Sequence, residues 1–252
     1  MGGSDNGSEA TLPQLRCGCY SAPPLRSVIV DVGIVPVKSL SRAKRRLAEH
    51  FAPDALMEIA WAMFQDTLAL CRACDFLDWT FVSADAPVRE AAEKAGLRAL
   101  EERPAPRGEQ GLNHALRFGI EAVTARGATS VTVIPVDVPL ASVEDVRDLL
   151  DTGELSDAVV VPAHRDGGTN GLYLAPPGVL PMKFGDASLS AYVAAAEENG
   201  LRCSVLALEG LGFDIDTIED VDALLANPAS AATVTAEVLA RSRPPASRGE
   251  AR

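Results

Sequence analysis

Short apolar runs alternate with amphipathic stretches along most of this chain, and this alternation limits the possible folds more than any other feature. The runs predict β-strands at residues 28–37, 79–84, 98–101, 130–136, 158–162, 171–175 and 202–208. The stretches between them predict helices at residues 53–71, 87–94, 113–125, 143–150, 189–198 and 218–226, the last capped by Thr217. Strands separated by such helices imply right-handed crossovers. We therefore expect an α/β fold, a three-layer sandwich with a mostly parallel central sheet.

The length and the composition of the ends indicate one domain. A chain of 252 residues, of which 47% are apolar, can bury one sizeable core. The two ends are rich in Gly, Ser, Pro or charged residues and cannot bury enough apolar surface to become ordered. We expect a single domain at residues 26–241, a disordered leader at 1–25 and a disordered tail at 242–252.

The charge balance limits the partners. With 35 acidic and 23 basic side chains, the net charge of -12 would repel polyanions, so we expect neither nucleic acid nor an anionic membrane as a partner. No apolar run approaches the roughly 20 residues that span a bilayer. The polar, acidic N-terminus has no secretion pattern, so we expect a cytoplasmic protein. We interpret Cys71 and Cys74 as thiols near a helix end, rather than as a zinc or redox pair.

A basic segment follows the first predicted strand, where an open α/β sheet binds its ligands. Five cations fall within nine residues of an otherwise acidic chain: Lys38, Arg42, Lys44, Arg45 and Arg46. Such a cluster would offset the charge of a triphosphate and of its pyrophosphate leaving group. The alternative is a solvated basic helix face.

Carboxylates follow two other predicted strands. Asp137 comes directly after the most apolar run, and Asp214 and Asp216 alternate on one side of an extended segment. A carboxylate fixed at the end of a strand is a usual ligand of Mg²⁺. One member of the second pair would bind metal together with Asp137, and the other would cap the following helix. The alternative is that Asp137, too, is a capping or turn residue.

Two further segments could bind phosphate. The turn at residues 166–171 is rich in glycine and carries the hydroxyl of Thr169, although it could equally be an ordinary hairpin turn. Residues 183–188 precede a helix, whose start offers N–H groups and the hydroxyl of Ser188 to an anion. The alternative is that Ser188 is simply the N-cap. The chain has neither a dinucleotide-binding glycine fingerprint nor a P-loop, and none of its three histidines has a recognisable partner in the sequence.

In this order, the segments resemble the 2-phospho-L-lactate and phosphoenolpyruvate guanylyltransferases of deazaflavin coenzyme biosynthesis, which have a GT-A-like nucleotidyltransferase fold. The matching pieces are PVKSLSRAKRRL (36–47), GLNHAL (111–116), DVPL (137–140), GGTNGLYL (167–174), FGDAS (184–188) and DIDTIEDV (214–221). The resemblance implies transfer of GMP from GTP to a three-carbon phospho-acid, with release of pyrophosphate. Phosphoenolpyruvate is the first candidate, followed by 2-phospho-L-lactate and 3-phospho-D-glycerate. A homodimer and a downstream transferase of the same pathway are further partners that it suggests.

The resemblance also implies roles for individual residues. Asp137 and Asp214 would hold Mg²⁺, and Lys38 and Lys44 would contact the GTP phosphates, so that these four form the catalytic set. The acceptor's phosphate would be bound by Thr169, Gly185 and Ser188, and the nucleoside would lie near the turn formed by Leu112 and Asn113.

Two departures from the family pattern bear on the acceptor and the nucleotide. Tyr192 stands where the family usually has a histidine, so we expect it at the carboxylate end of the acceptor, without a positive charge. The stretch before Asp137 lacks the usual glycine, which would alter the packing around the nucleotide. The alternative functions are a nucleotidyltransferase for a sugar phosphate or molybdopterin, and a non-catalytic nucleotide-binding regulatory module.

Overall fold

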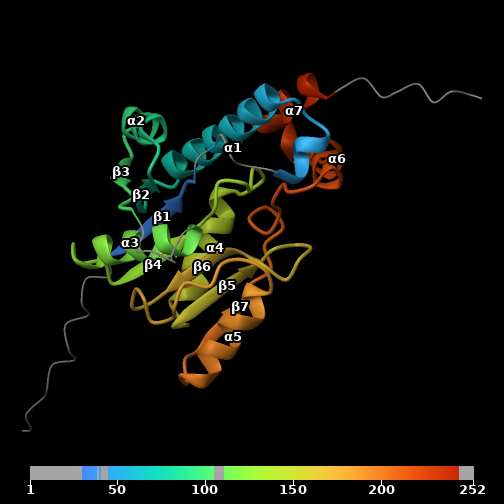
Figure 1. Cartoon of the computed structure of the whole chain (residues 1–252). Helices are drawn as coiled ribbons and strands as arrows, with labels where there is room; N and C mark the ends of the chain where they lie inside the picture. Colours follow the sequence, from blue (N-terminus) through green and yellow to red (C-terminus); the bar gives the residue numbers. More distant parts are fainter. Residues whose placement is uncertain (1–29, 39, 41–44, 105–110, 244–252) are drawn as a thin grey trace, which may run out of the picture.

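The computed structural model describes residues 30–38, 40, 45–104 and 111–243. Its centre is a seven-stranded sheet in the order β3-β2-β1-β4-β6-β5-β7 (Figure 1). The strands are β1 (Asp31–Pro36), β2 (Asp78–Ser83), β3 (Arg98–Glu101), β4 (Ser130–Val133), β5 (Ala158–Pro162), β6 (Thr169–Leu174) and β7 (Cys203–Val205). Only β6 runs antiparallel to its neighbours, β4 and β5, so the predicted mostly parallel sheet is confirmed.

Helices cover both faces of the sheet. They are α1 (Pro53–Ala73), α2 (Ala86–Lys94), α3 (Leu112–Thr124), α4 (Val143–Gly153), α5 (Ser188–Glu198), α6 (Ile218–Ala226) and α7 (Val234–Ser242), with 3-10 turns at Arg45–Glu49 and Pro228–Ala232. Because side chains alternate along a strand, Val35 and Phe81 join the core under α1, α4, α6 and α7, whereas Ile34 and Val82 join the core under α3 and α5. The three-layer prediction is confirmed.

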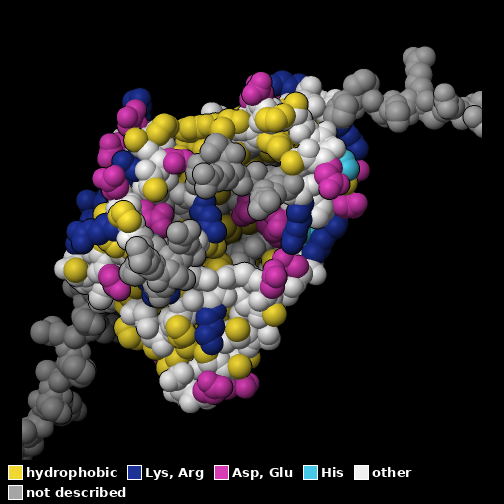
Figure 2. Space-filling view, viewed as in Figure 1, with side chains coloured by type: hydrophobic (Ala, Val, Ile, Leu, Met, Phe, Trp, Pro, Cys, Tyr) yellow, Lys and Arg dark blue, Asp and Glu magenta, His cyan; other side chains and the backbone are white. Residues whose placement is uncertain are grey.

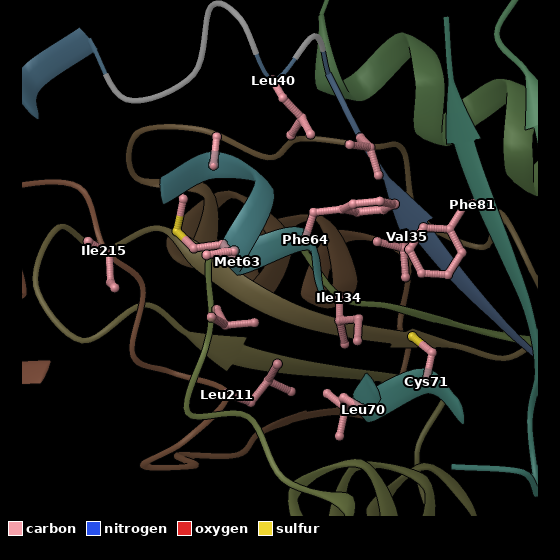
Figure 3. Close-up of a cluster of buried hydrophobic side chains, with 14 of the residues drawn as sticks. Val35, Leu40, Met63, Phe64, Leu70, Cys71, Phe81, Ile134, Leu211 and Ile215 are labelled. Carbon is pink, nitrogen blue, oxygen red and sulfur yellow. The ribbon is translucent and has the colours of Figure 1, made fainter. Parts of the chain in front are cut away.

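The core under α1 is dense in aromatic and aliphatic side chains (Figure 3). Phe64 on α1 packs edge to face on Phe81 of β2, with ring centroids 5.8 Å apart and an interplanar angle of 84°. Cys71 and Cys74 are buried in this core, where burial raises the pKa of Cys71 and raises that of Cys74 to about 11. Because their pKa values are raised, both thiols stay protonated and pack as small apolar side chains, which fits their interpretation as thiols near a helix end.

Two strands are shorter than predicted. The run at 130–136 leaves the sheet after Val133, because Pro135 has no N–H to donate to a neighbouring strand. The run at 202–208 forms only β7, which pairs with three residues of β5 at the edge of the sheet. The run at 28–37 forms a strand at Asp31–Pro36, and residues 28 and 29 lie outside the described residues.

Helix α7 was not predicted, although Thr233 is its N-cap and accepts a hydrogen bond from the Ala236 N–H at 3.1 Å. A distant contact also holds its start. The Asp66 carboxylate on α1 accepts hydrogen bonds from the N–H groups of Val234 and Thr235, at 2.8 and 2.9 Å. It thereby satisfies free amides of the first turn. Helix α7 ends at Ser242, one residue into the expected tail; the leader and residues 244–252 of the tail lie outside the described residues. In the described part of the chain, no helix is both long and apolar enough to cross a membrane.

Candidate active site

Predicted site residues from several loops lie at the edge where β1 and β4 end. Lys38 follows β1 and Asp137 follows β4, as predicted. Because β6 runs the opposite way, its first residues, Thr169 and Asn170, lie at this same edge. The space-filling view shows the molecule hollowed near its centre, with basic and acidic side chains around the hollow (Figure 2). The topology therefore gathers residues that are more than 100 positions apart in the sequence.

The two predicted metal ligands lie on adjacent segments. The Ile215 N–H donates to the Asp137 carbonyl oxygen at 3.0 Å, so the backbone beside Asp214 runs against Asp137. Asp214 is 15% exposed, and its Oδ1 accepts a hydrogen bond from Asn170 Nδ2 at 2.9 Å. The same Asn170 amide donates to the Gly212 carbonyl at 2.9 Å, which ties the start of β6 to the segment carrying Asp214.

This pair of carboxylates fits a hard divalent cation. Oxygen is the ligand that Mg²⁺ prefers, and Mg²⁺ usually keeps several waters and substrate oxygens among its ligands. Among the described residues, no three His, Cys, Asp or Glu side chains gather to form a complete protein cage. An ion held by Asp137 and Asp214 would therefore take its other ligands from water and substrate.

Helix α6 is not capped by Asp214 or Asp216, contrary to the expectation that one of them would do so. Thr217 is its N-cap, as predicted, and forms a capping box with Asp220. The side chain of Asp216 instead lies 3.4 Å from Arg46, an exposed ion pair that joins the basic segment to this segment. Burial raises the pKa of Asp220, but the N–H groups of Asp216 and Thr217 hold it below the usual value.

His164 does have partners, so the expectation from the sequence was wrong. Its ring stacks on Phe213 with centroids 4.8 Å apart. Its Nδ1 lies 3.4 Å from Asp214 and its Nε2 3.4 Å from Asp220. Arg165 Nε also lies 3.0 Å from the same Asp220 oxygen, as an ion pair without hydrogen-bond geometry. His164 therefore bridges a predicted metal ligand and the cap of α6.

The predicted phosphate-binding hydroxyls lie together. Ser188 Oγ donates to Thr169 Oγ1 at 2.9 Å, and both residues are buried. Ser188 is the first residue of α5 and not its N-cap, a place taken by Ala187 in the left-handed region with φ 53°. The Ser188 and Leu189 N–H groups already donate to the carbonyls of Gly185 and Gly167, which uses two of the helix's first amides.

Residues 183–187 form a loop before α5, which we call the acceptor loop because the resemblance assigns the acceptor's phosphate to it. Gly185 has φ 132°, a conformation that strains any residue with a β-carbon. Asn113 on α3 binds the neighbouring Phe184 on both sides: its Nδ2 donates to the Phe184 carbonyl at 3.0 Å, and its Oδ1 accepts from the Phe184 N–H at 2.8 Å. Leu112 and Asn113 thus begin α3 and do not form the expected turn.

Tyr192 lies inside the protein and not at the surface of the site. Its side chain is fully buried among apolar residues of α3, α5 and β4. The phenol oxygen accepts a hydrogen bond from the Lys183 N–H at 2.9 Å. Without a rearrangement of the core, it cannot touch a ligand. The expectation that Tyr192 faces the acceptor's carboxylate is therefore corrected.

The basic side of the site is more exposed. Lys38 is exposed, and a β-carbon on Gly111 would come within 3.3 Å of its Nζ. Gly111 has φ 106°, a conformation that strains any residue with a β-carbon. Burial raises the pKa of nearby Glu102, while the charges of His114 and Lys38 oppose that shift. Lys44 lies outside the described residues.

Comparison with known proteins shows the family of this chain. The family model described as guanylyl transferase CofC like matches residues 32–239, which include every described residue of the site. The chain belongs to this family of guanylyl transferases. It is 32% identical over 197 residues to the phosphoenolpyruvate guanylyltransferase of Sphaerobacter thermophilus, a match covering 78% of this chain and 93% of that protein. It is 36% identical over 193 residues to the 2-phospho-L-lactate guanylyltransferase of Methanothermobacter thermautotrophicus, covering 76% and 82%.

Solved structures share the fold of this guanylyl transferase family member at lower identity. A Desulfovibrio desulfuricans G20 protein named as a nucleotide-diphospho-sugar transferase has a TM-score of 0.69 at 18% identity, covering 84% of this chain and 94% of that one. Rv0371c of Mycobacterium tuberculosis H37Rv, solved in complex with manganese, has a TM-score of 0.54 at 20% identity, covering 80% and 100%. These likenesses support the GT-A-like fold.

Sequence reasoning on this guanylyl transferase missed His164 and Asn170 as supports of Asp214. Asn170 lies within the glycine-rich segment that we singled out, but only the antiparallel return of β6 brings it to Asp214, 44 residues later. His164 precedes that segment, and nothing in its immediate sequence signals a partner. The motif GGTNG marked the right segment but did not reveal what the Asn170 amide does.

Proposed function

We propose that this protein transfers GMP from GTP to a three-carbon phosphorylated acid in a Mg²⁺-dependent reaction that releases pyrophosphate. The main support is that Asp137 and Asp214 lie on hydrogen-bonded segments, at the same edge as the hydroxyls of Thr169 and Ser188. Family membership supports GMP as the transferred group, and the names of the two relatives support a phospho-acid as the acceptor.

The reaction needs positioning more than proton transfer. A phosphate oxygen of the acceptor attacks the α-phosphorus of GTP and forms a new P–O bond, while the bond to the β-phosphate oxygen breaks and its electron pair leaves with pyrophosphate. A phosphate monoester is largely deprotonated at pH 7, so no general base is required. This suits a site whose polar groups are carboxylates, hydroxyls and cations.

Each group in the site has a role in this scheme. Asp137 and Asp214 would hold Mg²⁺, which when bound supplies positive charge against the phosphate oxygens. Lys38 and Lys44 would bind the triphosphate and the departing pyrophosphate. Thr169, Gly185 and Ser188 would hold the acceptor's phosphate, and Leu112 would border the nucleoside. His164 and Asn170 hold Asp214 in place.

Among acceptors we expect phosphoenolpyruvate first, 2-phospho-L-lactate next and 3-phospho-D-glycerate third. All three carry a phosphate and a carboxylate on a short chain, so the same phosphate site would accept each. Since Tyr192 is buried, the carboxylate must be recognised by another group. The names of the two relatives favour the first two acids.

Pyrophosphate release tests the proposal. Purified protein with Mg²⁺ would be assayed with GTP, ATP, CTP and UTP against the three acids, a sugar 1-phosphate and molybdopterin. We expect release with GTP and at least one of the acids, and a product with the mass of GMP joined to the phospho-acid through a diphosphate (P–O–P) linkage. Preference for the sugar phosphate or the pterin would overturn the acceptor assignment, and absence of release with every pair would favour a nucleotide-binding module.

A further inference from the structure

The acceptor loop is fastened to the rest of the protein through its own backbone. Asn113 presents both an acceptor and a donor to Phe184, at 2.8 and 3.0 Å, much as a neighbouring β-strand would. Both backbone groups of one loop residue are thereby satisfied by a single side chain from α3. A pair of hydrogen bonds of this kind fixes the position and the orientation of the peptide.

Tyr192 provides a second fastening, from helix α5. Its hydroxyl accepts the N–H of Lys183 at 2.9 Å, and its ring meets Phe184 edge to face at 5.9 Å and 78°. The ring is fully buried, and burial raises the pKa of the phenol, which keeps the hydroxyl neutral. The loop is thus held between the first turn of α3 and the second turn of α5.

The fastened residues directly precede the expected phosphate site. Gly185 follows Phe184, and its carbonyl accepts the Ser188 N–H at 3.1 Å. The Ser188 hydroxyl in turn donates to Thr169. A shift of Phe184 would therefore be transmitted through Gly185 to the hydroxyl pair. Because a displacement of about 1 Å at a reacting group can reduce a rate about a hundredfold, this chain of contacts matters for function.

We propose that Asn113 and Tyr192 are positioning residues that hold the acceptor loop in the shape that binds the phosphorylated acid. This inference rests on the proposed function. It changes two roles that the resemblance suggested: Asn113 acts through Phe184 and not on the nucleoside, and Tyr192 acts through Lys183 and not on the carboxylate. The two residues therefore govern the affinity for the acceptor without contacting it.

Steady-state kinetics with each substrate varied in turn test the inference. Asn113→Ala and Tyr192→Phe should each raise KM for the phospho-acid about tenfold, the effect expected when one or two buried hydrogen bonds are lost. KM for GTP should stay within about twofold, since the fastenings act on the acceptor loop alone. Asn113→Asp is a second variant that separates the two bonds, because it keeps the acceptor for the Phe184 N–H but sets a repulsive carboxylate oxygen against the Phe184 carbonyl; it too should raise KM for the phospho-acid.

Tyr173→Phe is the matched control. Tyr173 is also buried, its hydroxyl faces Ser130, and it lies near the far end of β6 from the hydroxyl pair. This variant should lower the melting temperature as much as Tyr192→Phe does, with unchanged KM for both substrates. An equal effect of both tyrosine variants on the acceptor KM would show that general stability, and not the loop, is responsible.

Other outcomes would show that Asn113 or Tyr192 contacts a substrate directly and does not position the loop. A rise in the GTP KM of Asn113→Ala, with an unchanged acceptor KM, would return Asn113 to the nucleoside and overturn the inference. A loss in Tyr192→Phe that affects phospho-acids but spares phosphomonoesters without a carboxylate would return Tyr192 to the acceptor's carboxylate. Wild-type protein inactive with every phospho-acid would instead refute the proposed function, which separates the two failures.

Discussion

The proposed function gives this site an acceptor side and a nucleotide side, and the two are held in different ways. On the acceptor side, Ser188 and Thr169 are buried and hydrogen-bonded, and the acceptor loop is fastened by uncharged groups. On the nucleotide side, Lys38 is exposed, and Arg46 forms an exposed ion pair with Asp216 at 3.4 Å. The acceptor side is therefore shaped before a ligand arrives, whereas the nucleotide side attracts charge.

The energies of the two kinds of contact explain the difference. A buried polar group that loses its partner costs about 1–3 kcal/mol, so the acceptor side resists rearrangement. An exposed ion pair is worth roughly 0–1 kcal/mol and is screened by salt, so the pair of Arg46 and Asp216 can open when a triphosphate competes for the guanidinium. In the proposed function, buried hydrogen bonds would thus give selectivity for the acid, and exposed charges would attract the nucleotide.

The largest loss of activity is expected on substitution of Asp137 or Asp214, the expected metal ligands. Asp137→Asn and Asp214→Asn should each reduce kcat by about a hundredfold or more, because an amide is a far weaker metal ligand than a carboxylate. The melting temperature should change little, since an amide oxygen at position 214 can still accept the Asn170 hydrogen bond. Turnover numbers at saturating Mg²⁺ and thermal melts would measure both.

Asp216→Asn is the control for the metal ligands, because its carboxylate faces Arg46. It should retain kcat within about threefold, as the loss of an exposed ion pair predicts. If both Asp137→Asn and Asp214→Asn stay as active as this control, the assignment of the metal ligands fails.

A smaller effect is expected on the nucleotide side. Lys38→Ala should lower kcat/KM for GTP by about 10–100-fold, the loss typical of a charged hydrogen bond to phosphate. Raising the salt concentration should weaken GTP binding more than acceptor binding, because exposed charges are screened. Initial rates across a salt series would measure this, with Lys94→Ala on α2 as a control for an exposed lysine away from the site. Equal salt effects on both substrates would remove the contrast between the two sides.

The smallest effect concerns the strain in the acceptor side. Ala187 has φ 53°, a conformation that costs a residue with a β-carbon about 1–2 kcal/mol. Ala187→Gly should therefore raise the free energy of unfolding, by less than about 1 kcal/mol because glycine gains freedom in the unfolded chain. Chemical denaturation would measure it. The same change at Ala191, inside α5, should destabilise by about 1 kcal/mol. Equal losses at both positions would mean that Ala187 carries no strain.

The alternation of apolar runs was enough to predict the sheet, because burial on both faces demands continuous apolar strands. It did not predict where β4 ends, since Ile134 is as buried as the strand itself and only Pro135 stops the ladder. Helix α7 escaped prediction for a different reason. Thr233 gives it a local N-cap, but the contact of its first amides with Asp66 spans 168 residues and leaves no local pattern.

The site was predictable where a residue follows a strand and unpredictable where two loops meet. Asp137 and Thr169 could be placed at one edge from topology alone. The sequence could not show that His164 reaches Asp214, because that contact crosses from one loop to another. Nor could spacing along α5 distinguish a buried Tyr192 from one that faces a ligand, since both positions fit a helical pattern.

The contact between α7 and Asp66 also bears on how the protein is made. Helix α1 is synthesised before α7, because Asp66 and Val234 are 168 residues apart, and Ala236, Val238 and Leu239 of α7 join its buried cluster. Until they arrive, the nascent chain must leave part of this apolar surface uncovered. Helix α7 therefore covers an apolar surface of α1 that stays exposed until α7 has been made.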